Sequence, residues 1–303
     1  MADLEGGRGG IGAPESSSDG PTASPARLPF GTGGDDTVDA QRRPEEPELD
    51  PEVVHAVATR IRAADVVVAL TGAGVSTASG IPDFRGPQGV WTKDPSAQRY
   101  VSIDAYLGDD EIRREAWRRR AAEPTWQAQP NEGHLALAEL ERLERLTALI
   151  TQNVDGLHLL AGSSPGRVIE IHGTVREVMC LSCDRRQPAL PVLDRVRAGE
   201  HDPRCAACGG ILKSATVSFG QSLDPALLQR AHDVTMAADV FLAVGSSLTV
   251  HPVALLPRTA LEAGAMLVIV NAEPTPYDDR ADVVLRTDAG TALTQIVAAV
   301  RSA

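Results

Sequence analysis

The sequence predicts an α/β protein whose parallel sheet is covered by helices on both faces. Two observations lead to this fold class. Short apolar runs of strand length recur along the chain, and stretches with helical periodicity lie between several of them. The expected strands are residues 65–70, 146–150, 168–171, 240–244, 266–270 and 283–285. The expected helices are residues 52–63, 134–146, 225–236, 252–263 and 291–301.

The first two elements show why each assignment is made. Asp50 and Pro51 precede the helix at 52–63, as an N-cap residue and a proline in the first turn do. Residues 65–70 form a compact apolar run of the length expected for a strand that is buried on both faces. The later runs repeat this pattern.

Composition narrows the function classes. The 303 residues carry a formal net charge of −12, which argues against non-specific binding of nucleic acid. The longest apolar runs are far shorter than the ~20 residues that span a bilayer, so we expect no membrane helix. We also see no signal peptide, and we therefore expect a cytoplasmic protein.

Residues 1–50 differ from the rest of the chain. They hold 11 acidic and 4 basic side chains and are rich in glycine and proline. A segment with so few apolar residues cannot offset the entropy lost on ordering, so we expect an acidic, disordered tail. It is either a solubilising extension or a partner-binding segment.

A glycine-rich turn follows the first predicted strand. Gly72, Ala73, Gly74 and Ser76 lie where a tight turn would let the backbone approach a pyrophosphate, with the N-terminus of the next helix behind it. The spacing differs from the usual dinucleotide-binding pattern. A plain strand-to-helix turn is therefore the competing interpretation.

Polar clusters follow the other predicted strands. Because the carboxyl ends of parallel strands meet at one edge of a sheet, several such clusters predict one extended polar ligand there. The residues are Gln152, Asn153 and Asp155 after the second strand, His172 after the third, Gly245, Ser246 and Ser247 after the fourth, and Asn271 after the fifth.

The four cysteines form two Cys-x-x-Cys pairs, Cys180 with Cys183 and Cys205 with Cys208. Two such pairs offer four thiolates, the ligand set of a closed, tetrahedral structural zinc site. Two disulfides are the alternative, which the absence of a secretion signal disfavours. The pairs interrupt the strand–helix alternation, so we expect a small inserted zinc-ribbon domain at about residues 174–214, with one Zn²⁺ per chain.

The motifs together resemble the sirtuins, a family of NAD-dependent protein deacylases with a Rossmann-like, doubly wound sheet. The resemblance runs from about residue 53 to residue 300. It rests on the two cysteine pairs and on GAGVS at 72–76, SGIPDFRG at 79–86, TQNVDGLH at 151–158, HG at 172–173, VSFG at 217–220 and GSSL at 245–248.

The resemblance implies an enzyme at residues 51–303 that transfers the acyl group of an acyl-lysine protein substrate to the ADP-ribose of NAD and releases nicotinamide. His172 would be the general base, with Asn153 and Gln152 at the ribose and Asp155 at the nicotinamide amide. The other implied NAD contacts are Gly72, Ala73, Gly74, Ser76, Asp83, Phe84, Arg85, Gly245, Ser246, Ser247, Asn271 and Ala289. Val217, Ser218, Phe219 and Gly220 would pair with the substrate backbone as an added strand.

Some positions depart from the family pattern. Ser214 stands where proline is common, Gln221 where glutamate is common, and Val154 where isoleucine is frequent. None touches the base or the cysteines, so they bear on substrate preference.

The arginine-rich stretch at 111–122 leaves the acyl preference open. Trp117 and Arg120 resemble the Tyr-x-x-Arg pair with which one sirtuin branch recognises succinyl groups, and a solvated basic helix face is the alternative. A long-chain or acidic-acyl deacylase, a protein mono-ADP-ribosyltransferase and a catalytically silent NAD-binding module are the other functions considered.

Overall fold

The computed structural model describes residues 49–84, 86–87 and 89–302. The predicted tail lies outside these residues apart from Leu49 and Asp50, and so does Arg85. Leu49 is buried against the core, and the Asp50 side chain accepts the Glu52 N–H at the start of the first helix, α1. The predicted cap of this helix is therefore confirmed, with Pro51 in its first turn.

The larger sheet has six parallel strands in the order β3-β2-β1-β7-β8-β9. Strand β1 is central, with Leu70 paired to Ile150 of β2 on one side and to Ala243 of β7 on the other. All five residues of β1 are buried, as are those of β7, because helices cover both faces. The strands are β1 Val67–Thr71, β2 Ala148–Thr151, β3 Val168–Glu170, β7 Val240–Val244, β8 Met266–Val270 and β9 Val283–Leu285.

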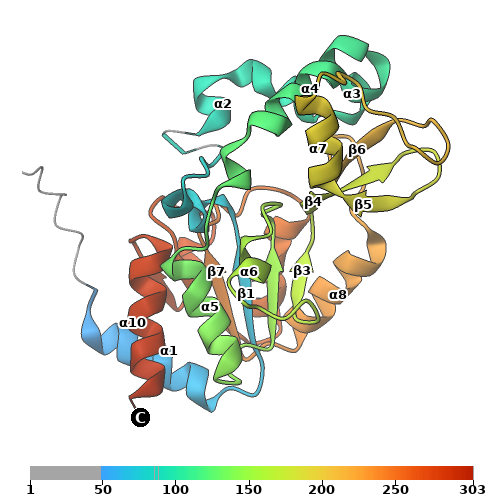
Figure 1. Ribbon diagram of the computed structural model, residues 1–303. Helices are drawn as coiled ribbons and strands as arrows, with labels where there is room; N and C mark the ends of the chain where they lie inside the picture. The colour runs from blue at the N-terminus through green and yellow to red at the C-terminus, as the bar shows by residue number, and fades with distance from the viewer. Residues whose placement is uncertain (1–48, 85, 88, 303) are drawn as a thin grey trace, which may run out of the picture. The chain divides into compact units, whose positions relative to one another are not determined.

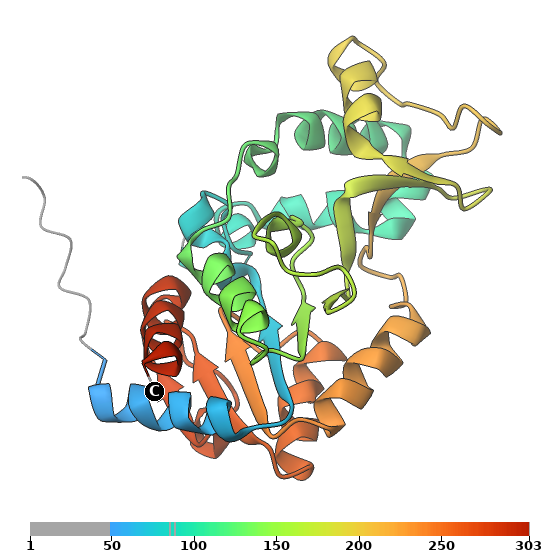
Figure 2. The ribbon, with the colours of Figure 1, turned by 60° about the horizontal axis from the view of Figure 1, so that its bottom comes forward.

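Two helical layers cover this sheet, each over its own apolar cluster. On one face, α1 Pro51–Ala63, α5 Glu132–Arg142 and α10 Ala289–Arg301 pack together around Leu137 and Leu293. The ribbon shows α1 and α10, at the two ends of the described chain, side by side (Figures 1 and 2). On the other face, α8 Pro225–Met236 and α9 Leu256–Glu262 pack around Phe241.

A second, antiparallel sheet has the strand order β5-β4-β6 and lies above the large sheet in the view of Figure 1. Its strands are β4 Gly173–Cys180, β5 Arg186–Pro188 and β6 Leu212–Thr216. Helix α7, Ala189–Arg197, and helix α4, Asp110–Ala122, pack on it around Trp117, Val178 and Leu193. Short helices complete the chain: α2 Val90–Lys93, α3 Ile103–Gly108 and α6 Leu157–Leu160.

Most predicted elements are confirmed, several with ends shifted by one to four residues, and two helices differ most from the prediction. Helix α5 starts at Glu132, where Asn131 caps it, and ends at Arg142 because Glu144 adopts a left-handed backbone with φ of 58°. The stretch predicted as one helix at 252–263 is a 3-10 turn, Val253–Leu255, followed by α9. Among the described residues no helix is long and apolar enough to cross a membrane.

Helix α5 offers a matched test of the core. Leu137 is fully buried, whereas Leu135 on the same helix is 51% exposed. Replacing Leu137 by alanine leaves a cavity between α5 and the sheet, so the free energy of unfolding should fall by about 2–5 kcal/mol. Urea denaturation of Leu137→Ala and Leu135→Ala measures both; equal losses in the two variants would contradict this packing.

Candidate functional site

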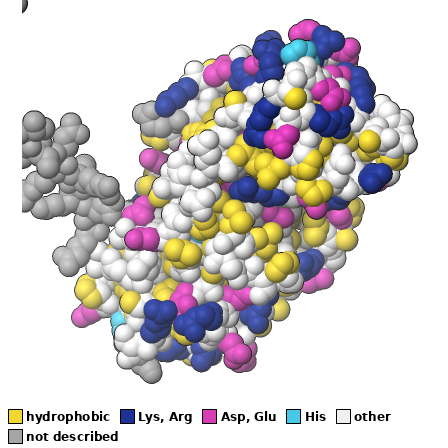
Figure 3. All heavy atoms as spheres, in the orientation of Figure 1, with side chains coloured by type: hydrophobic (Ala, Val, Ile, Leu, Met, Phe, Trp, Pro, Cys, Tyr) yellow, Lys and Arg dark blue, Asp and Glu magenta, His cyan; other side chains and the backbone are white. Residues whose placement is uncertain are grey.

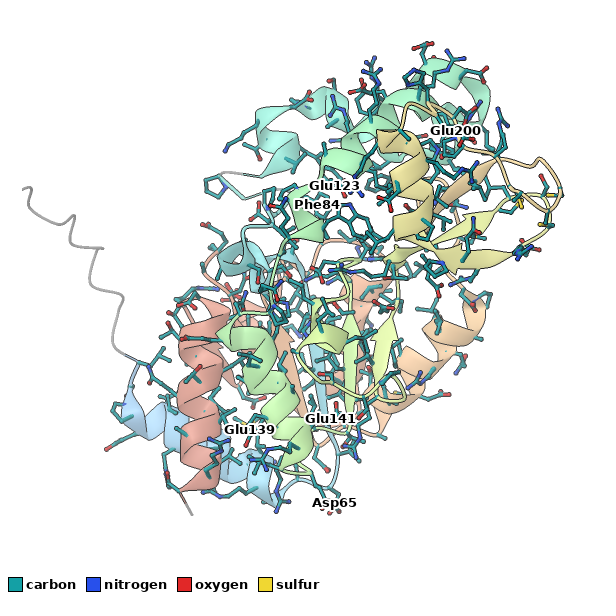
Figure 4. All side chains as sticks on the ribbon, viewed as in Figure 1. Asp65, Phe84, Glu123, Glu139, Glu141 and Glu200 are labelled. Carbon is teal, nitrogen blue, oxygen red and sulfur yellow. The ribbon has the colours of Figure 1, made fainter. Side chains whose placement is uncertain are left out.

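The site residues gather at one edge of the large sheet. All six strands are parallel, so their carboxyl ends meet there, and the strand order reverses between β1 and β7, where ligands bind in open α/β sheets. Figure 4 shows Asp65, before β1, at the lower end of the sheet and Phe84, in the loop beyond β1, above the opposite end.

Two glycine turns meet at this reversal. The Gly74 N–H donates to the Gly245 carbonyl oxygen at 2.8 Å, and the Gly72 N–H donates to the Val244 carbonyl oxygen at 3.0 Å. Gly245 has φ of 59°, and a Cβ on it would lie 2.4 Å from the Val75 nitrogen. Only glycine fits at this contact, because any side chain would push the two turns apart.

The helix predicted behind the first turn is absent. The chain forms two 3-10 turns there, Ala73–Val75 and Thr77–Ser79, and Gly80 ends the second with φ of 81°. An anion at this turn would therefore meet individual N–H groups and no α-helix end. The Ala73 N–H is one of them, since it has no acceptor among the described residues.

Ser76 joins the glycine turn to the loop after β2. Its buried hydroxyl donates to Asp155 Oδ2 at 2.8 Å and lies 3.0 Å from Asn153 Nδ2, which donates to it. Asn153 Nδ2 also donates to the Gly72 carbonyl oxygen at 3.0 Å. Both amide hydrogens of Asn153 are thus used, and its Oδ1 is left to accept a ligand hydroxyl.

The loops after β2 and β7 are also joined directly. Gln152 Nε2 donates to the Ser246 hydroxyl at 2.8 Å. The remaining predicted NAD contacts on this side lie further along the edge. Ser247 is exposed and bonds to Thr249. Asn271 follows β8 and donates to the Glu273 carbonyl oxygen. Ala289 is the buried first residue of α10.

His172 follows β3 with a defined tautomer. Its Nδ1 lies 3.0 Å from the Gln152 carbonyl oxygen, which can only accept, so Nδ1 carries the hydrogen and Nε2 carries the lone pair. Burial lowers the pKa of His172, and the contact with Gln152 opposes that shift. The ring is therefore a neutral imidazole with one basic nitrogen.

An aromatic chain links the loop after β1 to the predicted substrate segment. The Phe84 and Trp91 rings lie 4.8 Å apart, and Trp91 lies 5.4 Å from the Phe219 ring. The loop is closed by backbone bonds from Val90 to Asp83 and from Trp91 to Phe84. Phe84 and Phe219 remain 41% and 47% exposed, so both rings still offer apolar surface to a ligand.

The predicted substrate segment, Val217 to Gly220, is already paired along one side. The Phe219 N–H donates to the Val101 carbonyl oxygen at 2.8 Å, and the Phe219 carbonyl oxygen accepts the Ile103 N–H. The Val217 N–H donates to the His172 carbonyl oxygen at 2.8 Å, which places the segment beside the imidazole.

Two buried histidines were missed by the sequence analysis. His134 lies 3.4 Å from the Ser76 hydroxyl and His158 lies 2.9 Å from the Thr71 hydroxyl, and their rings lie 4.8 Å apart. Burial lowers the pKa of both, that of His158 to about 3, so both rings are neutral supports beneath the site. His158 ends the TQNVDGLH motif but was given no role, and His134 lies outside the motifs, so nothing in the chain order pointed to their contact.

The four cysteines converge at the far end of the small sheet. Their Sγ atoms all lie within 4.8 Å of one another, with Cys180 and Cys208 3.5 Å apart and Cys183 and Cys205 3.9 Å apart. A tetrahedral zinc with Zn–S bonds of about 2.3 Å needs sulfur atoms about 3.8 Å apart, so the residues fit the ion. The cluster offers four thiolates and no open position, as a structural site requires.

Comparison with known proteins identifies the family. The model of the Sir2 family matches residues 72–252. The NAD-dependent protein deacetylase 2 of Streptomyces coelicolor is 53% identical over 228 residues, which is 75% of this chain and 95% of that protein. The chain belongs to the Sir2 family. The NAD-dependent protein deacetylase of Sulfolobus acidocaldarius is 43% identical and covers 81% of this chain and 94% of its own length.

Solved Sir2 structures have the same fold. One, of a Sir2 variant with a deacetylated p53 peptide and 3′-O-acetyl ADP-ribose, is 35% identical and superposes with a TM-score of 0.74, covering 80% of this chain and 96% of its own. Another, of Sir2 with a p53 peptide and NAD⁺, is 36% identical with a TM-score of 0.70, covering 79% and 95%.

The structure shows the contacts of the three residues that depart from the Sir2 sequence pattern, Gln221, Val154 and Ser214. Gln221 Oε1 accepts the Ser218 N–H at 2.9 Å, a bond that a glutamate oxygen could also make. Val154 is partly buried, and its carbonyl oxygen accepts the Val175 N–H at 2.8 Å, a bond that isoleucine would make equally. Ser214 is fully buried, and its hydroxyl has no partner among the described residues.

The cysteine cluster predicts a change in both metal content and stability. Cys180→Ser should lower zinc below one ion per chain and lower the melting temperature, because metal binding and folding are coupled. Ser182→Ala, in the same knuckle, is the matched control and should keep both. Elemental analysis and thermal melts measure the effect; full zinc content and an unchanged melt in Cys180→Ser would contradict a structural site.

Proposed function

We propose that the chain is an NAD-dependent protein-lysine deacetylase that moves the acyl group from lysine to ADP-ribose and releases nicotinamide. The observation that carries this proposal is the neutral His172 imidazole. The Gln152 carbonyl oxygen sets its basic Nε2, and the His172 carbonyl oxygen accepts the Val217 N–H of the substrate segment. The names of the close relatives support the same activity.

The residues of the sheet edge would divide the binding of NAD between them. Gly72, Ala73, Gly74 and Gly245 would approach the phosphates with backbone atoms, and Ser246, Ser247, Asn271 and Ala289 would line the adenosine side. Asn153 Oδ1 would accept a ribose hydroxyl, since its amide hydrogens are already used. Asp155 can accept the nicotinamide amide because a carboxylate oxygen accepts more than one bond.

The chemistry of NAD is the transfer of its ribose carbon from nicotinamide to an acyl oxygen. His172 would then remove a proton from the ribose hydroxyls through Nε2, which its tautomer leaves free. Phe84 would cover the ribose and exclude water, since its ring is partly exposed and contacts Trp91, which in turn contacts Phe219. Asp83 would hold this loop through the Gly86 N–H.

An acyl-lysine peptide would pair with the substrate segment on its open side. Phe219 directs its backbone groups toward residues 101–103. Because backbone groups alternate along an extended chain, Ser218 directs its groups toward the opposite side, where a peptide can add as a strand. Gly220, with φ of 87°, turns out of the extended segment, and the Ser218 carbonyl oxygen accepts the Gln221 N–H at 2.9 Å. The Ser218 N–H is held there by Gln221 Oε1, which the peptide would have to replace.

The zinc module and the location complete the proposal. Residues 174–214 would form the inserted domain, held by one structural Zn²⁺ on Cys180, Cys183, Cys205 and Cys208. The four sulfurs lie close enough to share one metal ion, and cysteine pairs that bind metal are typical of proteins in reducing compartments. We therefore propose a cytoplasmic location.

Replacement of His172 tests the catalytic role. His172→Ala should lower the rate of NAD-dependent acetyl-peptide deacetylation by about 10²–10⁴-fold, the usual contribution of a general base. His232→Ala removes an exposed histidine of α8 and serves as the matched control. Nicotinamide release and peptide mass are measured together on the zinc-loaded protein.

The outcomes separate the candidate functions. O-acetyl-ADP-ribose from the wild type, and its loss in His172→Ala, supports the deacetylase. Transfer of ADP-ribose to protein without deacetylation would assign a mono-ADP-ribosyltransferase, and NAD binding without turnover would assign a silent binding module. A wild-type rate in His172→Ala would show that another group is the base.

The pH profile provides a separate test. His172 must be neutral to act, and its pKa lies below the usual value of 6.5, so kcat/KM should fall only as pH drops below 6.5. Burial raises the pKa of the nearby Glu170 to about 7. If activity required the ionised Glu170, kcat/KM would already fall near pH 7, above the fall expected from His172. Glu170→Gln should keep the fall of kcat/KM at acid pH that we assign to His172. Loss of this fall in Glu170→Gln would assign it to Glu170.

A further inference from the structure

Arg176 is a partly buried cation that contacts the loop after β2. It lies in β4, four residues after His172. Its Nε donates to the backbone carbonyl oxygen of Asp155 at 2.7 Å, and its Nη2 donates to the Thr125 carbonyl oxygen at 3.4 Å. One side chain of the small sheet therefore contacts both this loop and the 3-10 turn η4, Pro124–Trp126.

The guanidinium of Arg176 lies over an aromatic ring. Its central carbon is 5.3 Å from the centre of the Trp126 ring, within the range of a cation–π contact. The Trp126 Nε1 donates to the Arg120 carbonyl oxygen, in the last turn of α4, at 2.8 Å. The ring against which Arg176 rests is therefore held by α4.

The stem of Arg176 fills the space beside Gly156, the residue after Asp155. Gly156 has φ of 73°, and a Cβ there would lie 3.0 Å from Arg176 Cγ and 3.1 Å from its Nε. The loop is held to β4 a second time, since the Val175 N–H donates to the Val154 carbonyl oxygen at 2.8 Å. Two neighbouring residues of β4 thus fix two neighbouring carbonyl oxygens of the loop.

Asp155 is held from both sides. Its carboxylate accepts the Ser76 hydroxyl on Oδ2 and the Leu157 N–H on Oδ1, both at 2.8 Å. These two bonds come from the loops of the large sheet, whereas the bond to its backbone oxygen comes from the small sheet. Asp155 is only 5% exposed, so a small displacement of its backbone would change what its carboxylate can reach.

The charge of Arg176 also acts on the carboxylates around it. Burial lowers the pKa of Arg176, and the negative charges of Asp155 and Glu170 oppose that shift. Arg176 acts on them through space, because its hydrogen bonds go to backbone carbonyl oxygens. It therefore offsets the negative charge beside the loop while its hydrogen bonds orient the backbone.

Other arginines in this part of the molecule differ from Arg176. Arg118 of α4 pairs with Glu115, and Arg186 of β5 pairs with Glu177, both with arginine side chains more than half exposed. Figure 3 shows positive and negative side chains mixed over the upper part of the molecule, where α4 lies. Exposed pairs of this kind add little to stability and fit the solvated basic face considered for α4. Arg176 instead uses its donors inside the molecule.

We propose that Arg176 is a positioning residue for the nicotinamide end of NAD. It would act through Asp155, by holding the turn at Asp155 and Gly156 against the small sheet, and it would touch neither NAD nor the peptide. The inference rests on the proposed deacetylase, because it requires that Asp155 accept the nicotinamide amide. A support of the fold without this role is the alternative, and its loss would weaken every part of the NAD site alike.

Product inhibition separates the two ends of NAD. Nicotinamide occupies only the end next to Asp155, and ADP-ribose occupies the rest of the site. Arg176→Met removes the charge and the donors and keeps an unbranched stem beside Gly156. In the deacetylation assay it should raise the inhibition constant of nicotinamide about tenfold or more, the effect of one charge-assisted hydrogen bond, and leave that of ADP-ribose within about twofold.

Matched variants control this measurement. Arg186→Met, in the same sheet at 57% side-chain exposure, should keep both inhibition constants. Trp126→Leu keeps Arg176 and removes the ring against it, so it should raise the nicotinamide constant alone by about two- to fivefold. Arg176→Lys keeps the charge and should recover part of the loss. Melting temperatures identify any variant that fails to fold, and if Arg176→Met is one, Trp126→Leu and Arg176→Lys carry the test.

A double-mutant cycle tests whether Arg176 acts through Asp155. In an Asp155→Asn background, Arg176→Met should change the nicotinamide constant by less than about twofold, because the carboxylate that Arg176 positions is already altered. A full tenfold effect in that background would show that Arg176 acts by another route and would overturn the proposal.

The outcomes distinguish this inference from the function on which it rests. An equal rise in both inhibition constants, or no rise in either, in folded Arg176→Met would overturn the positioning role and leave the deacetylase in place. Absence of nicotinamide release when the wild type is given NAD and an acetyl-lysine peptide would refute the deacetylase itself.

Discussion

The contact between two glycine turns determines the position of the other groups at the site. Gly74 and Gly245 approach each other without side chains, so the loops after β1 and β7 lie against one another at the point where the strand order reverses. A residue with a Cβ at either position would separate the loops. Ser76 would then no longer be held where it meets Asn153 and Asp155.

The polar groups around this contact show a consistent division of roles. Backbone carbonyl oxygens and buried hydroxyls fix the orientation of each side chain, and one polar atom of that side chain is left without a partner inside the site. Gln152 does this for His172, and Gly72 does it for Asn153. The supporting histidines, His134 and His158, are kept neutral by burial, so they add no charge beneath Asp155.

How much of the structure the sequence predicts depends on how far apart along the chain the interacting residues lie. The zinc ligands follow from spacing alone, because each pair lies within one knuckle, and the sheet follows from the recurring apolar runs. The helix expected after Gly74 was wrong, since tertiary contact with Gly245 favours 3-10 turns there over local propensity. The contacts of Arg176 with Asp155 and Trp126 could not be predicted, because they depend on how the small sheet packs beside the loop after β2.

The chain of rings from Phe84 through Trp91 to Phe219 has a thermodynamic consequence. It joins the loop proposed to cover the ribose to the segment proposed to receive the peptide. If a ligand moved Phe84 or Phe219 and altered its contact with Trp91, binding at the two ends would be coupled. Linkage requires such an effect to be reciprocal, so the factor by which a peptide changes the affinity for NAD equals the factor by which NAD changes the affinity for the peptide.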